Sequence, residues 1–167
     1  MVAAFVLIAC KKNPDDRALP YVVLTGSDSA VTTATCMRVT TDEQWQALWE
    51  RHTADDTTNV SEFATNRMPE IDFTQCMVIA IFGGKGWNTY GLRFISSEDR
   101  ADSLVLGIDW LTYQTKIQGD SVSPFGFLIL PRTSKALVLE YDNRNLMERA
   151  QHVAPIWVEF HRFPEIM

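Results

Sequence analysis

Residues 75–96 read QCMVIAIFGGKGWNTYGLRFIS: two apolar runs joined by a glycine-rich loop. The first run, residues 76–82, is apolar at every position, which a strand tolerates only when both of its faces are covered. We therefore predict a central strand here. The second run, residues 90–96, also has strand character, so we expect the two runs to form a core hairpin. The tip of this hairpin carries Trp87, Asn88 and Tyr90.

Outward from this hairpin, short apolar or alternating runs are separated by turn residues, which is typical of strands. One helix is expected at residues 42–52, because Thr40 or Thr41 can cap it and Gln44 follows at the spacing of a capping box. Its apolar stripe consists of Trp45, Leu48, Trp49 and His52. The further strands are expected at residues 21–24, 31–39, 103–111 with an extension to 117, 125–130, 136–141 and 156–163.

These elements predict a mainly β fold: an antiparallel β-sandwich or open barrel of about seven to eight strands, with one amphipathic helix packed on it. A length of 167 residues favours a single domain, and 46% hydrophobic residues can fill its core. The net charge of -6 argues against a nucleic-acid partner, because contacts to phosphates require clustered Lys and Arg.

The first ten residues, MVAAFVLIAC, have the form of an export signal, and residues 7–10 resemble a bacterial lipobox. On this interpretation residues 1–9 are a truncated signal-like segment, Cys10 is the lipidated residue, residues 10–20 are a tether and residues 21–167 form the domain. The expected location is the bacterial cell envelope, periplasmic or surface-facing, with a lipid at Cys10 as the membrane anchor. The alternative that stays open is a plain buried N-terminal strand.

An oxidising compartment would allow Cys36 and Cys76 to form one disulfide. This hypothesis rests only on the presence of two internal cysteines. The alternative is that both are small buried hydrophobic residues.

The sequence contains no pattern that predicts catalysis, a metal site or a cofactor. The glycine loop at residues 83–89 leads into a strand instead of the helix that a phosphate-binding loop requires. His52, His152 and His161 lack the spacing of metal ligands. Asp55 and Asp56 lack the third oxygen donor and the glycine of a calcium loop. We therefore expect a non-enzymatic protein that binds through Trp87, Asn88 and Tyr90, since exposed Trp and Tyr are typical interface anchors.

Several motifs resemble, in their order and spacing, the C-terminal domain of the PrcB-like family of exported bacterial lipoproteins. They are WQALW at residues 45–49, PEIDF at 69–73, MVIAIFG at 77–83, the loop ending in Tyr90 and PFGFLILPR at 124–132. Of the Gly-Gly-Tyr that is usual at the family's loop tip, Tyr90 alone is present. The resemblance implies an accessory domain that binds and stabilises an exported protease. Two alternatives stay open: a small-ligand or glycan binder that uses Trp87 and Tyr90, and a hydrolase with a scattered site.

Overall fold

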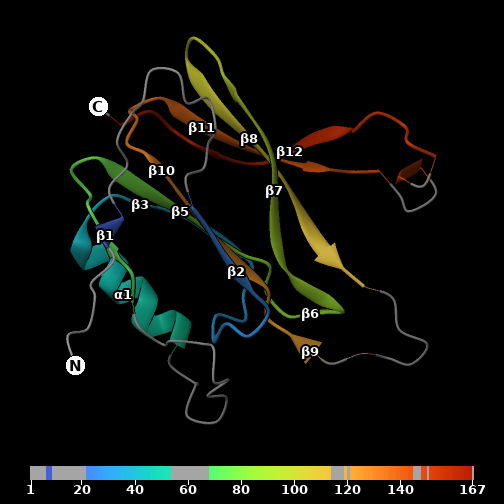
Figure 1. Ribbon diagram of the computed structural model, residues 1–167, viewed down its shortest axis with the longest axis horizontal. Coiled ribbons are helices and arrows are strands. Elements are labelled where there is room, and N and C mark those ends of the chain that lie inside the picture. The colour runs from blue at the N-terminus through green and yellow to red at the C-terminus, as the bar shows by residue number, and fades with distance from the viewer. Residues whose placement is uncertain are drawn as a thin grey trace.

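The computed structural model describes residues 7–8, 22–53, 68–113, 119, 121–144, 148–149 and 151–166. Within them, two four-stranded sheets and one helix form three layers (Figure 1). The first sheet has the order β2 (Val22–Gly26), β10 (Phe125–Pro131), β5 (Cys76–Phe82) and β3 (Thr35–Val39). The second sheet has the order β12 (Trp157–Phe163), β11 (Ala136–Asp142), β8 (Ser103–Thr112) and β7 (Thr89–Asp99). Two short pairs complete the fold: β1 (Leu7–Ile8) with β4 (Glu70–Ile71), and β6 (Gly86–Trp87) with β9 (Ser121–Val122).

The central strand β5 is buried along its whole length, as its unbroken apolar sequence predicts. Side chains alternate between the faces of a strand, so β5 contributes to two separate cores. Val78 and Ala80 pack in the core under the helix, whereas Ile79 and Ile81 pack against the second sheet. The first sheet is therefore the middle layer of the molecule.

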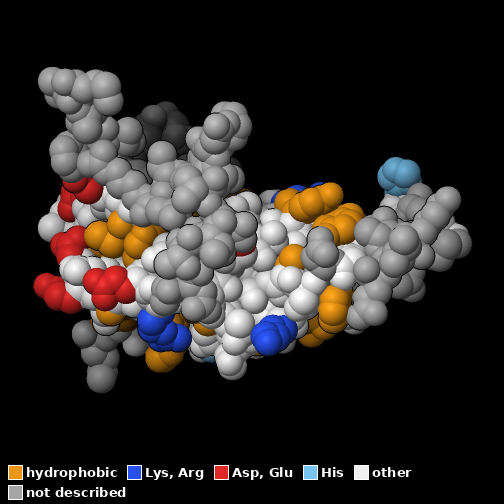
Figure 2. All heavy atoms as spheres, turned by 90° about the horizontal axis from the view of Figure 1, so that it is seen from below, with side chains coloured by type: hydrophobic (Ala, Val, Ile, Leu, Met, Phe, Trp, Pro, Cys, Tyr) orange, Lys and Arg blue, Asp and Glu red, His pale blue; other side chains and the backbone are white. Residues whose placement is uncertain are grey.

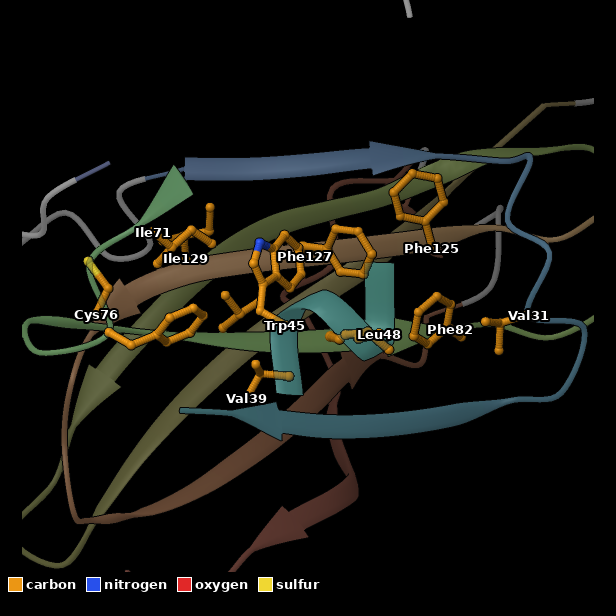
Figure 3. Packing of buried hydrophobic residues seen from close by; sticks show 13 residues of the cluster. Val31, Val39, Trp45, Leu48, Ile71, Cys76, Phe82, Phe125, Phe127 and Ile129 are labelled. Atoms are coloured by element: carbon orange, nitrogen blue, oxygen red, sulfur yellow. The ribbon is translucent and has the colours of Figure 1, made fainter. Parts of the chain in front are cut away.

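The helix α1 (Asp42–Thr53) covers the outer face of the first sheet. Thr41 caps it, since the Thr41 hydroxyl accepts a hydrogen bond from Gln44 N at 3.3 Å, and the Gln44 side chain accepts one from Thr40 N at 2.9 Å. Trp45 and Leu48 are each 1% exposed and lie over the strands (Figure 3). Indole Nε1 of Trp45 donates to the carbonyl of Pro69 at 3.0 Å, so its polar atom is also satisfied. The predicted helix is confirmed.

The mainly β class with antiparallel pairing is confirmed, but one pairing within the two large sheets differs. Strand β11 runs parallel to β8, from Ala136 opposite Ser103 to Tyr141 opposite Ile108. The second sheet is thus mixed. The eight strands of the two large sheets match the predicted number, and the two short pairs add to it.

The predicted core hairpin is wrong. β5 pairs with β3 and β10 in the first sheet, while β7 pairs with β8 in the second. Residues 83–88 therefore carry the chain from one sheet to the other. The prediction assumed that consecutive strands pair, which is common but not general, whereas both edges of β5 are occupied by strands from elsewhere in the chain.

The predicted strand at residues 31–39 is shorter than expected and begins at Thr35. At the N-terminus, Leu7–Ile8 pair in parallel with β4, which is consistent with the strand alternative for this segment. Cys10, the tether, Asp55, Asp56 and residues 114–118 lie outside the described residues.

Candidate functional site

The loop that crosses between the sheets displays the two aromatic side chains that the sequence singles out. Trp87 is 52% exposed and Tyr90 is 62% exposed. Trp87 lies on β6, which pairs with β9 in a two-stranded ribbon, with Trp87 opposite Ser121. Tyr90 lies near the start of β7. Both rings can therefore contact another molecule.

A third aromatic residue, Tyr113, belongs to the same surface. Its ring centroid lies 4.3 Å from that of Tyr90, with 32° between the ring planes. Its backbone N–H donates to the carbonyl of Asn88 at 2.9 Å. Tyr113 fits the alternation of the strand that precedes it, and no local pattern in the sequence indicates that it lies beside Tyr90. We call Trp87, Tyr90 and Tyr113 the aromatic surface.

Asn88 shapes the loop between the two exposed rings. Its φ is 55°, in the left-handed region that Asn tolerates better than most residues. A Cβ atom added at Gly119 would lie 1.6 Å from Oδ1 of Asn88. The absence of a side chain at Gly119 therefore permits the two residues to approach closely. Asn88 is half-buried, and its carbonyl accepts the hydrogen bond from Tyr113 N.

The base of the aromatic surface is attached to the first sheet. Gly91 has φ +135°, and a Cβ there would lie 2.3 Å from Thr25 Oγ1 and 2.8 Å from the carbonyl of Gly26. The Thr25 hydroxyl accepts a hydrogen bond from Leu92 N at 2.6 Å and donates one to the carbonyl of Phe125 at 2.9 Å. β7 thus meets β2 directly beside Tyr90.

The proposed disulfide between Cys36 and Cys76 is wrong, because Cys36 is a free thiol. Cys36 pairs with Ile81 across the sheet, five positions along β5 from Cys76, a separation of about 17 Å at the usual strand rise. Disulfides require Cα atoms within about 7 Å. Cys76 is itself disulfide-bonded, so its sulfur pairs with a residue other than Cys36. Burial raises the pKa of the Cys36 thiol to about 11, which also disfavours a catalytic thiolate.

His52 forms a buried pair with Ser29, a residue that the sequence did not indicate. The His52 Nδ1 and Ser29 Oγ atoms lie 2.9 Å apart, and Ser29 Oγ accepts a hydrogen bond from Val31 N at 3.1 Å. The two residues are 8% and 4% exposed, and the ring of Phe125 lies 4.2 Å from that of His52. This enclosure leaves a substrate no access to the serine, so the pair has a structural role.

A cluster of charged residues lies on the second sheet, around the carboxylates of Asp109 and Asp142. Both are buried. Arg149 donates to both carboxylate oxygens of Asp109, and Arg144 donates to both oxygens of Asp142. Arg93 adds a third guanidinium, at 3.0 Å from Asp109. Because the carboxylates already bind these guanidinium groups, the cluster holds the segment after β11 against β8.

His161 lies on β12, half-buried beside Phe163, and His152 is exposed with φ 57°. Among the described residues, no group of three or more His, Cys, Asp and Glu side chains could hold a metal ion. Within the residues that the structure describes, no helix has both the length and the apolar character needed to cross a membrane.

The fold and this site define a three-layer, mainly β domain with an exposed aromatic surface at a crossing loop. Comparisons with models of known families, with curated proteins and with solved structures found no match.

Proposed function

We propose that this protein is a non-enzymatic binding module of the bacterial cell envelope and that its partner is another protein. The observation that carries the proposal is the exposure of Trp87 and Tyr90, each more than half accessible, on a loop anchored to the first sheet. Tryptophan and tyrosine contribute much of the free energy at protein interfaces. Because Gly91 and Thr25 fix the base of the loop, little conformational entropy is lost when the aromatic surface binds.

The class of partner that we propose is an exported protease, for which this domain would be an accessory subunit. Support comes from the PrcB-like order of motifs, which includes the loop ending in Tyr90. This protein would bind such a protease in a fixed stoichiometry, and the protease would not cleave it. The half-buried, protonated Cys36 and the enclosed Ser29 favour this binding role over hydrolysis.

The experiment compares capture of a partner from native envelope extract by the full chain and by the Trp87→Ala, Tyr90→Ala variant. Both substitutions remove exposed rings, so thermal stability should stay unchanged. The matched control is Val153→Ala, Ile156→Ala, which removes side chains that are 40% and 46% exposed at another place. We expect the aromatic variant alone to lose the captured protein. Retention of this protein by the folded aromatic variant would exclude the aromatic surface as the main contact.

A second candidate function is the binding of a glycan or another small ligand on the same aromatic surface. The observation that favours it is the ring of Tyr90, which is supported by Tyr113 at 4.3 Å and stays 62% exposed. Sugars stack on exposed aromatic faces. Quenching of tryptophan fluorescence by a panel of sugars, abolished by Trp87→Ala, would favour this function over protein binding. Trp45 is 1% exposed and serves as an internal reference that sugars do not quench.

The location in the envelope is proposed from residues 7–10, which have the form of a lipobox. A lipid at Cys10 is the proposed membrane anchor. Stable anchoring requires more than one acyl chain on this residue. Mass analysis of the N-terminal peptide from native membranes tests the anchor, because acylation adds the mass of its chains to the peptide that contains Cys10.

A further inference from the structure

A cavity of about 480 Å³ opens between the two sheets, away from the aromatic surface. It lies between β3 and β12, the edge strands of the first and second sheets. Ile81, Trp110 and Phe160 supply its apolar walls, and Cys36 and His161 supply polar atoms. Small-molecule sites in proteins have volumes of about 300 to 1,000 Å³ and this mixture of apolar walls with a few polar groups. The cavity therefore has the size and lining of a ligand site.

A β-bulge places one aromatic wall of this cavity. In the pairing of β11 with β12, Leu139 lies opposite His161 and the adjacent Glu140 lies opposite Glu159. Phe160 is thus an extra residue in β12. Bulges redirect a side chain and are common beside functional sites. Phe160 remains 40% exposed while lining the cavity, so its ring is accessible to a guest.

The polar groups of the cavity indicate what charge a guest can have. Burial raises the pKa of the Cys36 thiol to about 11, so this wall is neutral at physiological pH and poorly hydrated. An anion or cation would lose its hydration there without gaining an opposite charge from this wall. The ring nitrogens of His161 can form a hydrogen bond with an uncharged polar group of a guest. Trp110 and Phe160 favour contact with another aromatic ring.

We propose that this cavity binds an uncharged aromatic small molecule, which packs against Trp110 and Phe160 and hydrogen-bonds with His161. This site is separate from the aromatic surface and does not depend on the function proposed for that surface. A molecule of this kind would reach the cavity from the solvent side of β12, past Phe160.

Cys36 offers a direct reporter of occupancy, because it lines the cavity and is a free thiol. The experiment measures its alkylation by iodoacetamide, an uncharged reagent, located by peptide mapping on the full chain. Indole serves as the uncharged aromatic probe and indole-3-carboxylate as its charged counterpart. We expect saturating indole to slow alkylation of Cys36 at least several-fold, and the carboxylate to leave the rate unchanged. Equal protection by both compounds, or none from indole up to its solubility limit, would overturn the proposal.

Variants at two exposed positions distinguish binding of indole in the cavity from a general effect of indole on alkylation. Phe160→Ala removes the accessible wall, and Ile156→Ala truncates a side chain of similar exposure that does not line the cavity. Protection by indole should be lost in the first variant and kept in the second. If Phe160→Ala remains folded by circular dichroism and keeps full protection, the proposed contact is wrong. The Trp87→Ala, Tyr90→Ala variant should keep protection, since its substitutions lie at the other site.

Discussion

At Asp142, a buried carboxylate is supplied with the hydrogen bonds that it would otherwise receive from water. Nε of Arg144 donates to its two oxygens at 2.9 and 2.8 Å, and Nη2 donates at 2.6 Å. Backbone N–H groups of Arg144 and Ile156 add further donors. These hydrogen bonds, chiefly those from the Arg144 side chain, lower the pKa of Asp142 to about 2. The residue therefore joins both ends of the loop between β11 and β12.

The first prediction is that Asp142→Asn lowers stability at neutral pH and lowers it much less at pH 2. A carboxylate whose pKa is lowered on folding stabilises the protein above its ordinary pKa of 3.8, and this contribution is lost as the pH falls through about 2. Urea unfolding of both proteins at pH 7, 4 and 2 measures the difference in free energy. Glu98→Gln, in an exposed ion pair with Arg100, is the control and should change little. An equal deficit of Asp142→Asn at pH 7 and pH 2 would contradict the role of the charge.

The charged cluster and Tyr113 could not be predicted from the sequence, for related reasons. Arg149 is 40 residues from Asp109, and no local spacing links the two. Strand periodicity says which face of a strand a residue occupies, but the partner on that face depends on which strands are neighbours. The exposure of Trp87 and Tyr90 could be predicted, because few residues are available to bury a side chain at a loop tip, whichever strands pair.

At the scale of elements, α1 was predictable because its signals are local. The cap at Thr41 and the stripe that includes Trp45 and Leu48 lie within a few turns of each other. We predict that Leu48→Ala lowers the free energy of unfolding by about 2 to 5 kcal/mol, the usual range for a buried leucine. Ala47→Ser, on the exposed side of the same helix, should cost about 0.5 kcal/mol or less. Chemical denaturation checks both values, and equal small losses would mean that α1 does not cover the sheet.

The contact between β7 and β2 gives the next prediction at this scale. Gly91→Ala should destabilise the protein by about 1 to 3 kcal/mol, because a side chain at φ +135° is strained and its Cβ would meet Thr25 and Gly26. The aromatic surface should move with it, so partner or sugar binding should weaken even where the variant is fully folded. Gly86→Ala is a suitable control, since a Cβ there lies 4.0 Å from its nearest neighbour, Pro124. If Gly91→Ala is neutral in both stability and binding, β7 is not anchored in this way.

At the scale of the whole molecule, the sequence predicts which strand lies between two layers better than it predicts which strands pair. The unbroken apolar run of β5 required cover on both faces, and α1 and the second sheet provide it. The strands that pair with β5 come from residues 35–39 and 125–131, and no local pattern specifies such distant pairs. Figure 2 shows that acidic side chains gather toward the end of the molecule that carries α1, leaving hydrophobic side chains exposed on the other half of this face.

The last prediction concerns the cysteines and the attachment of the whole domain. The chain has three cysteines; Cys36 is free and Cys76 is disulfide-bonded. Within a single chain, a disulfide at Cys76 and acylation of Cys10 therefore exclude each other, because both would require the same remaining sulfur. The disulfide at Cys76 predicts one reactive thiol in the unfolded, unreduced protein, which peptide mapping would assign to Cys36, whereas a lipid at Cys10 predicts two.

Two reactive thiols, at Cys36 and Cys76, would instead mean that Cys10 is acylated and that Cys76 is unpaired. Reduction is the matched control, since it should add thiols only where a disulfide was present. With one thiol before reduction, the lipid anchor would be excluded, while the disulfide would support export. The thiol count thus separates two parts of the proposed location that residues 7–10 alone cannot separate.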